Sequence, residues 1–240
     1  MSRYEKRPDL TLWLVRHGES EQNARMLGRD YPDYPDHAAP LTDAGLEQAS
    51  AAGEFLARTL EARGCPPDEA VLFYSPYVRA RQTAKRILEK LPGVAGVCDD
   101  MLVEQDFGLF DGVPLYEIQT IYAKEHRVFS RARQYGGKFF ARRPNGERPL
   151  DVEVRQRLFL DDMHRYLIGH PAVKHVIVVG HGAQLTVLRK LLRSESYEWY
   201  EGQPNPGNAS IRRLILWTDG SCDDFGYAYG DDGVNEADGN

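Results

Sequence analysis

Apolar residues gather in short runs that are separated by longer stretches of helical periodicity. The runs are four to seven residues long and contain β-branched or aromatic side chains, as buried strands do. We expect strands over residues 11–15 (TLWLV), 70–75 (AVLFYS), 94–97, 175–180 (HVIVVG) and 211–217 (IRRLILW).

Four stretches between these runs have apolar residues at the spacing of one helix face. Helices are expected over 42–64, over 79–90, over 150–168 and from Gly182 onward. In the third, the apolar stripe consists of Leu158, Phe159, Met163, Tyr166 and Leu167. Strands that alternate with helices predict a three-layer α/β/α sandwich with a mainly parallel central sheet. Because no repeat or linker divides the chain, we expect one domain over residues 1–240.

The composition is that of a folded protein in a reducing compartment. Of the 240 residues 42% are hydrophobic, yet none of the apolar runs reaches the roughly 18 residues of a membrane-spanning helix. The first residues lack the pattern of a secretory signal. Three cysteines (Cys65, Cys98 and Cys222) are odd in number and widely spaced, which favours free thiols. A cytoplasmic location is therefore expected, with no membrane as a partner.

Charge is unevenly distributed along the chain, whose formal net charge is −6. Residues 219–240 contain seven acids and no Lys or Arg, which is typical of a solvated, flexible tail. Residues 116–148 contain eight bases and three acids, interleaved with aromatic residues. This segment reads either as a helical excursion with a solvated basic face or as a lid, over about 113–148, above an anionic substrate. Without a basic face on the body, no nucleic-acid partner is expected.

Two predicted strands are each followed by a His-Gly pair, in Arg16-His17-Gly18 and in His181-Gly182. A third ends at Ser75, and Arg79 follows one helical turn later. Because ligands bind at the carboxyl ends of the strands in open α/β sheets, these side chains are expected to meet there. Two guanidinium groups and two imidazoles around one point predict a pocket for an anion such as phosphate. A nucleoside-triphosphate P-loop is excluded because no GxxxxGK[ST] motif is present.

Five ordered blocks carry a resemblance to a known family. They are LVRHGES followed by Asn23, PLTDAG at 40–45, YSPYVRARQTA at 74–84, LVEQDFGLFDG at 102–112 and VVGHG at 178–182. Together they resemble the histidine phosphatase superfamily, the phosphoglycerate-mutase-like proteins with the RHG motif. The segment from Arg143 through Glu147, with Asp151 and Arg155, is similar to a further block of this family.

The resemblance implies a role for each matching residue. His17 is expected to be the nucleophile that becomes a phosphohistidine, and Glu104 the general acid that protonates the leaving oxygen. Arg16, Arg79 and a protonated His181 are expected to hold the phosphoryl group. The pocket is further expected to be bordered by Asn23, Gly182, Arg142 and Arg143. Neither a metal nor another cofactor is implied, because transfer through His17 needs none.

Three functions remain open at this point. A metal-independent phosphatase acting on a small phosphorylated metabolite is favoured, because Gln105 follows Glu104 where mutases of the family carry Arg, and Gly28-Arg29 stands where they carry Gly-Trp. The alternatives are phosphoglycerate-mutase-type transfer and a catalytically weak protein that binds a phosphorylated ligand; a phosphopeptide substrate also stays open.

Two further departures from the family are Arg148 in place of Ser and a loop over 31–37 that looks inserted. Nothing in the sequence indicates the oligomeric state.

Overall fold

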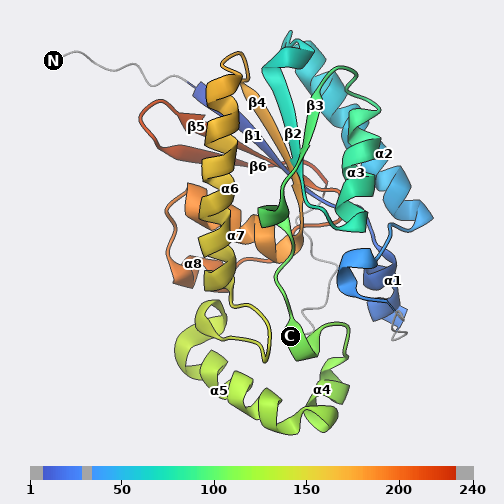
Figure 1. Cartoon of the computed structure of the whole chain (residues 1–240), viewed down its shortest axis with the longest axis vertical. Coiled ribbons are helices and arrows are strands. Elements are labelled where there is room, and N and C mark those ends of the chain that lie inside the picture. Colours follow the sequence, from blue (N-terminus) through green and yellow to red (C-terminus); the bar gives the residue numbers. More distant parts are fainter. Residues whose placement is uncertain (1–7, 29–33, 231–240) are drawn as a thin grey trace, which may run out of the picture.

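A computed structural model describes residues 8–28 and 34–230 of the chain. Six strands form one sheet, in the order β3-β2-β4-β1-β5-β6. The strands are β1 (Pro8–Arg16), β2 (Ala70–Tyr74), β3 (Ala95–Cys98), β4 (His175–Gly180), β5 (Ile211–Trp217) and β6 (Cys222–Tyr229). The first four are mutually parallel, whereas β5 and β6 are antiparallel to their neighbours. The predicted α/β fold with a mainly parallel sheet is confirmed (Figure 1).

Helices cover both faces of this sheet. The α-helices are α1 (Glu21–Gly28), α2 (Asp43–Ala62), α3 (Val78–Leu88), α4 (Leu115–Ile121), α5 (Ala123–Phe140), α6 (Pro149–Gly169), α7 (Gly182–Leu192) and α8 (Tyr197–Glu201). Short 3₁₀ turns are η1 (Asp36–Ala38), η2 (Pro67–Glu69), η3 (Asp100–Leu102) and η4 (Gly108–Phe110). Each helix or strand expected from the apolar pattern is present, with bounds within a few residues.

The alternation of side chains along the strands produces two separate apolar cores. On β1, Trp13 and Val15 face α2 and α3, where they pack with Leu56 and Ile87. The intervening residues of the same strand face α6 and α7. There the fully buried side chains include Leu12, Val178, Phe159 and Leu188. Because both faces are covered, the central strands are apolar throughout, as the sequence pattern indicated.

The loop after β1 is held against the start of α2 by two glycines. A Cβ on Gly18 would lie 2.3 Å from the carbonyl oxygen of Gly45, and one on Gly45 would lie 2.0 Å from that of Glu19. Helix α2 is capped by Thr42, whose hydroxyl accepts a hydrogen bond from the Gly45 amide at 3.0 Å. The contact between the two backbones therefore requires glycine at both positions, and it holds the loop that begins with His17.

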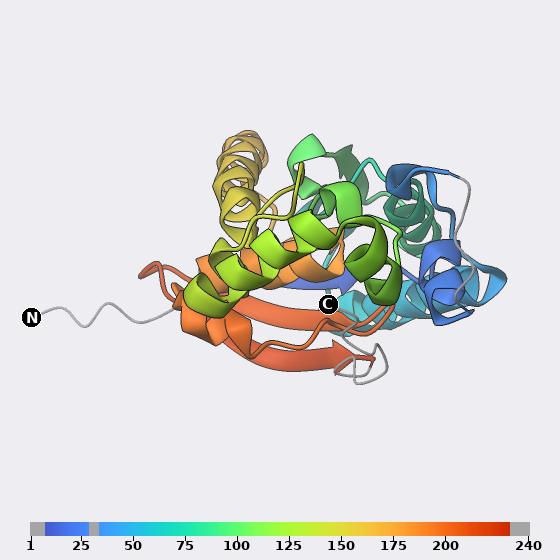
Figure 2. The same cartoon turned by 90° about the horizontal axis from the view of Figure 1, so that it is seen from below.

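Helices α4 and α5 lie below the carboxyl ends of the parallel strands (Figures 1 and 2). They lie within the segment 113–148, which the sequence analysis interpreted either as a helical excursion or as a lid; we call this segment the lid. Gly137, with φ of 75°, breaks the helical path near the end of α5. Beyond this break, Phe139 is buried in a small third core with Val152, Val187 and Tyr200. The end of α5 is thereby packed onto α6, α7 and α8.

Two details of the sequence prediction were wrong. Leu158 does not belong to the buried stripe of α6, because its side chain is 52% exposed. The acidic stretch from 219 does not begin a flexible tail, because residues Cys222–Tyr229 form β6 against β5. Residues 231–240 lie outside the described part of the chain. Within that part, no helix is both long and apolar enough to cross a membrane, and the three cysteines form no disulfide.

Candidate active site

His17 and His181 are brought together by the register of the central strands. Arg16, the last residue of β1, pairs with Gly180, the last residue of β4. The residues that follow are therefore neighbours: the His17 amide donates to the Gly180 carbonyl at 3.0 Å, and the two imidazole centroids are 5.2 Å apart. The sequence prediction that the two strand ends share one site agrees with this geometry.

The backbone determines which nitrogen of His17 can react. Nδ1 lies 2.7 Å from the Gly18 carbonyl oxygen, which can only accept, so Nδ1 carries the proton. Nε2 then has the lone pair, and it accepts a hydrogen bond from Arg79 Nε at 3.2 Å. Burial, followed by the charges of Arg79 and Arg16, lowers the pKa of His17 well below its usual value. The ring is therefore neutral near pH 7, as a nucleophile must be.

Two buried guanidinium groups flank the imidazoles. Arg16 is 6% exposed, and its Nη1 donates to the Pro206 carbonyl at 2.5 Å. Arg79, in the first turn of α3, is 4% exposed and lies over the ring of Tyr77 at 5.1 Å. Two guanidinium charges held close together in the protein interior favour a positive potential, so this edge of the sheet can hold an anion.

His181 is fully buried, and its Nε2 lies 2.8 Å from the Ser75 hydroxyl. Its Nδ1 has no hydrogen-bond partner among the described residues. Burial and the charge of Arg79 hold the pKa of His181 well below its usual value. In the site without a phosphoryl group the ring is therefore neutral, and a protonated His181 in the complex stays a prediction. A neutral ring that accepts the Ser75 proton at Nε2 carries its own proton on Nδ1, where it is available as a donor.

Glu104 lies at the amino end of α7, directly beside His181. Its Oε1 accepts hydrogen bonds from the amides of Gln105 at 2.8 Å and Gln184 at 3.0 Å, and its Oε2 accepts a longer one from Ala183 at 3.3 Å. Burial raises the pKa of Glu104, and the amides of Gln105 and Gln184 oppose this only in part. The carboxyl group therefore keeps a proton to higher pH than an exposed glutamate does.

Arg155 on α6 fixes the segment that carries Glu104. Its guanidinium donates to the carbonyls of Met101 and Val103 at 2.7 Å and of Glu104 at 3.0 Å. It also forms an ion pair with Glu147 at 3.0 Å. In the sequence this arginine stood out only as part of the family-like block, because its three carbonyl partners are about fifty residues away.

Two carboxylates that the sequence did not single out face the same cluster. Asp36 in η1 forms an ion pair with Arg79 at 2.9 Å. Asp111 lies nearby, and burial together with the charge of Asp36 raises its pKa to about 6. Asp36 belongs to the loop over 31–37 that looks inserted in the sequence; residues 31–33 of this loop lie outside the described residues.

The remaining predicted residues are distributed differently. Gly182 adjoins the cluster, since a Cβ there would lie 3.8 Å from Arg16 Nε. Asn23 accepts hydrogen bonds from Ser20 and so holds the start of α1. Arg142 forms an ion pair with Asp151 at 2.6 Å and donates to the Gly146 carbonyl at 2.9 Å. Arg143 stacks over the rings of Phe107 at 4.4 Å and Phe129 at 5.6 Å, between lid and body.

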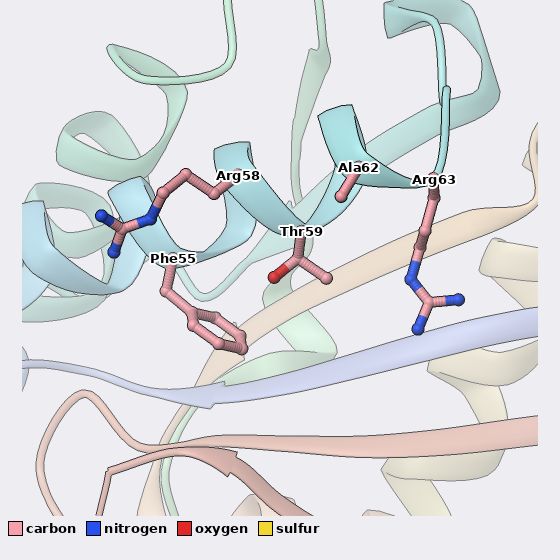
Figure 3. Close-up of a pocket in the computed structure, with 5 residues that line it drawn as sticks. All are labelled: Phe55, Arg58, Thr59, Ala62 and Arg63. Carbon is pink, nitrogen blue, oxygen red and sulfur yellow. The ribbon is translucent and has the colours of Figure 1, made fainter.

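The open hollow on α2 is a different feature of the molecule (Figure 3). It is lined by Phe55, Arg58, Thr59, Ala62 and Arg63, and none of the imidazoles or buried arginines described above reaches it. Arg63 lies at the carboxyl end of α2 with its guanidinium over Trp13. The imidazoles and the buried arginines therefore lie at the sheet edge and not in this hollow.

Comparisons with known proteins match most of the chain. The family model of the histidine phosphatase superfamily (branch 1) matches residues 12–222. The chain is 36% identical over 214 residues to the phosphoglycerate mutase-like protein AT74 of Arabidopsis thaliana, which covers 85% of this chain but only 64% of AT74, less than two thirds of its length. It is 31% identical over 186 residues to a 2,3-bisphosphoglycerate-dependent phosphoglycerate mutase of Sinorhizobium fredii (76% of this chain, 79% of that protein). Among solved structures, a mycobacterial glucosyl-3-phosphoglycerate phosphatase superposes with a TM-score of 0.71 at 21% identity, covering 92% of this chain and 99% of that one.

Proposed function

Because the chain belongs to the histidine phosphatase superfamily, we propose that it hydrolyses phosphate monoesters through a phosphohistidine on His17. The observation that carries this proposal is the protonation state of His17. Its Nδ1–H is bonded to the Gly18 carbonyl, so the reactive lone pair is on Nε2, next to two buried arginines and His181.

In the first step Nε2 of His17 forms a bond to phosphorus while the bond from phosphorus to the ester oxygen breaks. Glu104 gives its proton to that oxygen, which leaves as an alcohol. The proton is best placed on Oε2, because Oε1 already accepts two short amide hydrogen bonds. In the second step a water oxygen attacks phosphorus, the N–P bond breaks, and Glu104 takes up the proton of the water.

The charge on the transferred group is balanced by Arg16, Arg79 and the Nδ1–H of His181. Such donors stabilise a phosphoryl transition state most strongly where water is excluded, and loss of one commonly costs about 10²–10³ in rate. His181 fills this role as a neutral donor when its Nε2 accepts the proton of the Ser75 hydroxyl, 2.8 Å away, because the ring's own proton is then on Nδ1. A dianionic phosphoryl group next to the ring would in addition raise the pKa of His181.

Hydrolysis is favoured over the mutase alternative by the residue after Glu104. Gln105 is 3% exposed, and its amide donates to the Glu147 carbonyl at 2.8 Å. Gln105 is thus held by the segment that precedes α6, and it offers no cation to a second acidic group of a phosphoglycerate. A mutase needs to hold such a substrate in both orientations between transfers.

The proposed function is tested by assaying the protein in EDTA with p-nitrophenyl phosphate and with 3-phosphoglycerate plus 2,3-bisphosphoglycerate. We expect phosphate release from the first substrate between pH 5 and 8, with conversion to 2-phosphoglycerate slower by at least about tenfold. Faster isomerisation than hydrolysis would identify a mutase. Binding of phosphate without turnover of either substrate would favour a regulator, and hydrolysis that requires added Mg²⁺ would contradict the His17 mechanism.

The lid supports a small phosphorylated metabolite with additional negative charge as the substrate. Arg143 is enclosed by aromatic rings, and burial lowers its pKa to about 10, with a further contribution from the charge of Arg133. Burying a guanidinium costs free energy, and pairing with a second anionic group of a substrate offsets part of that cost. The geometry gives no such support to Arg142, whose partner is Asp151.

Replacing Arg143 by alanine is expected to raise KM for a sugar bisphosphate about tenfold and KM for the matching monophosphate less than threefold, because one charge-assisted hydrogen bond is lost. The matched control is Arg131→Ala, an exposed lid arginine that lies over Tyr135. Steady-state kinetics on both sugars measure the ratio of the KM of each variant to that of the wild type. An equal effect on the two substrates would show that Arg143 serves only the packing of the lid.

A further inference from the structure

All three nitrogens of the Arg79 guanidinium have partners within the protein. Nε donates to His17 Nε2 at 3.2 Å. Nη1 donates to the backbone carbonyl of Asp36 at 2.6 Å, and Nη2 donates to the carboxylate Oδ2 of Asp36 at 2.9 Å. Asp36, Arg79 and His17 therefore form a continuous carboxylate–guanidinium–imidazole chain.

This chain conflicts with the reaction in two ways. The lone pair of His17 Nε2, which must reach phosphorus, is engaged by the Nε–H of Arg79. Asp36 engages one N–H on each of Nη1 and Nη2. A phosphoryl group that binds Arg79 through two N–H donors therefore competes with the carboxylate of Asp36 for this guanidinium.

The position of Asp36 makes such an exchange physically reasonable. The carboxylate is on a one-turn 3₁₀ segment, η1, and its side chain is 16% exposed, against 5% for Arg79. The neighbouring His37 contacts Tyr77 only ring to ring, at 6.2 Å between centroids. In addition to burial, the charge of Asp36 raises the pKa of Glu104 and of Asp111, and it repels any incoming dianion. Asp36 is thus the more exposed partner of the ion pair, and its carboxylate opposes the binding of a further negative group.

We propose that Asp36 is a positioning residue that competes with the phosphoryl group for Arg79 and holds the guanidinium against the nucleophile until a substrate displaces it. The proposal rests on the proposed function, since it takes Arg79 and His17 as the groups that meet the phosphoryl group. Asp36 acts through Arg79 and does not itself react.

The direction of the expected effect distinguishes this role from a structural ion pair. An ion pair that merely supports Arg79 would weaken phosphate binding when it is removed. A competing carboxylate would strengthen phosphate binding on removal, because the free protein loses a charge-assisted contact that the complex does not have. Charge-assisted hydrogen bonds are about twice as strong as neutral ones, so the expected change is about tenfold.

The test is calorimetric titration of the wild type, Asp36→Asn and Asp68→Asn with inorganic phosphate. Asp68 is exposed in η2, before the amino end of β2, and its substitution removes the same charge at the opposite end of that strand. We expect Asp36→Asn to bind phosphate about tenfold more tightly than the wild type, and Asp68→Asn to bind like the wild type. Asp36→Ala, which keeps only the backbone contact to Nη1, is expected to bind at least as tightly as Asp36→Asn.

The KM for p-nitrophenyl phosphate provides a second measurement. Loss of a purely structural ion pair would raise this KM, whereas loss of a competing carboxylate would lower it. KM should fall in Asp36→Asn, and inhibition by product phosphate should become stronger. Unchanged or weaker phosphate binding by a folded Asp36→Asn protein would overturn the inference and leave the proposed function intact. Absence of phosphate binding in all of these proteins would contradict both.

Discussion

Replacing His17 by asparagine is expected to abolish phosphate release from p-nitrophenyl phosphate, with kcat reduced by about 10⁴–10⁶-fold. Asparagine retains a side-chain N–H that can donate to the Gly18 carbonyl in place of Nδ1, so the loop conformation is preserved. It has no lone pair equivalent to Nε2, so no bond to phosphorus can form. The large loss follows because every later step uses the covalent intermediate.

The covalent intermediate gives a more direct measurement than turnover. Brief incubation with a ³²P-labelled substrate and denaturation in base should leave label on the wild-type protein that acid removes, as expected of a phosphoramidate. His17→Asn should take up no label. The matched control is His164→Asn, which removes an exposed imidazole on α6 and should label normally. Equal labelling of His17→Asn and the wild type would assign the nucleophile elsewhere.

Replacing Glu104 by glutamine is expected to reduce kcat/KM for glycerol phosphate by about 10²–10³-fold, but that for p-nitrophenyl phosphate by less than tenfold. An alkoxide is a poor leaving group and needs the proton of Glu104, whereas p-nitrophenolate leaves without one. Glutamine can still accept the amide hydrogen bond of Gln184 through its oxygen, so the geometry is maintained. Because kcat/KM reports the steps up to the first irreversible one, the comparison isolates proton donation.

The pH profile of the same variant tests the protonation states. Burial raises the pKa of Glu104, so the wild-type kcat/KM for glycerol phosphate should fall as pH rises through that raised pKa. The pKa of His17 is lowered, so activity should also fall as pH decreases through it, when Nε2 becomes protonated. Glu104→Gln should lose the alkaline limb and keep the acidic one.

Glu47→Gln, an exposed substitution on α2, serves as the control and should retain both limbs. An alkaline limb that persists in Glu104→Gln would assign the acid to another group, of which Asp111 with its pKa of about 6 is the nearest candidate.

Much of the fold could be predicted because its information is local. The run HVIVVG is apolar without alternation, as a strand covered on both faces must be, and it forms β4 over His175–Gly180. Thr42 caps the start of α2 because its hydroxyl accepts a backbone hydrogen bond, and Gly64 follows the end of the helix because it adopts a positive φ. Each signal depends on the type of a single residue. The meeting of His17 with His181 also followed, since parallel strands place their carboxyl ends at one edge.

Strand β6 could not be predicted from its composition. It is an edge strand with alternating partly buried and exposed residues, and its acids face solvent or the arginines of neighbouring elements. Asp224 illustrates this, because it forms ion pairs with Arg189, Arg193 and Arg212. A sequence that resembles a solvated tail is ordered here by pairing with β5 and by charges that are distant along the chain.

The chemical identity of the site was thus determined by short motifs, whereas its electrostatic state depends on contacts that only folding creates. The neutral form of His181 results from its complete burial beside Arg79, and the protonation of His17 at Nδ1 results from where the Gly18 carbonyl points. The engagement of Arg79 by Asp36 joins residues 43 positions apart through a loop without periodicity. Hydrophobic periodicity encodes which face of an element is buried, but burial of a charge and the approach of two loops depend on the whole tertiary arrangement.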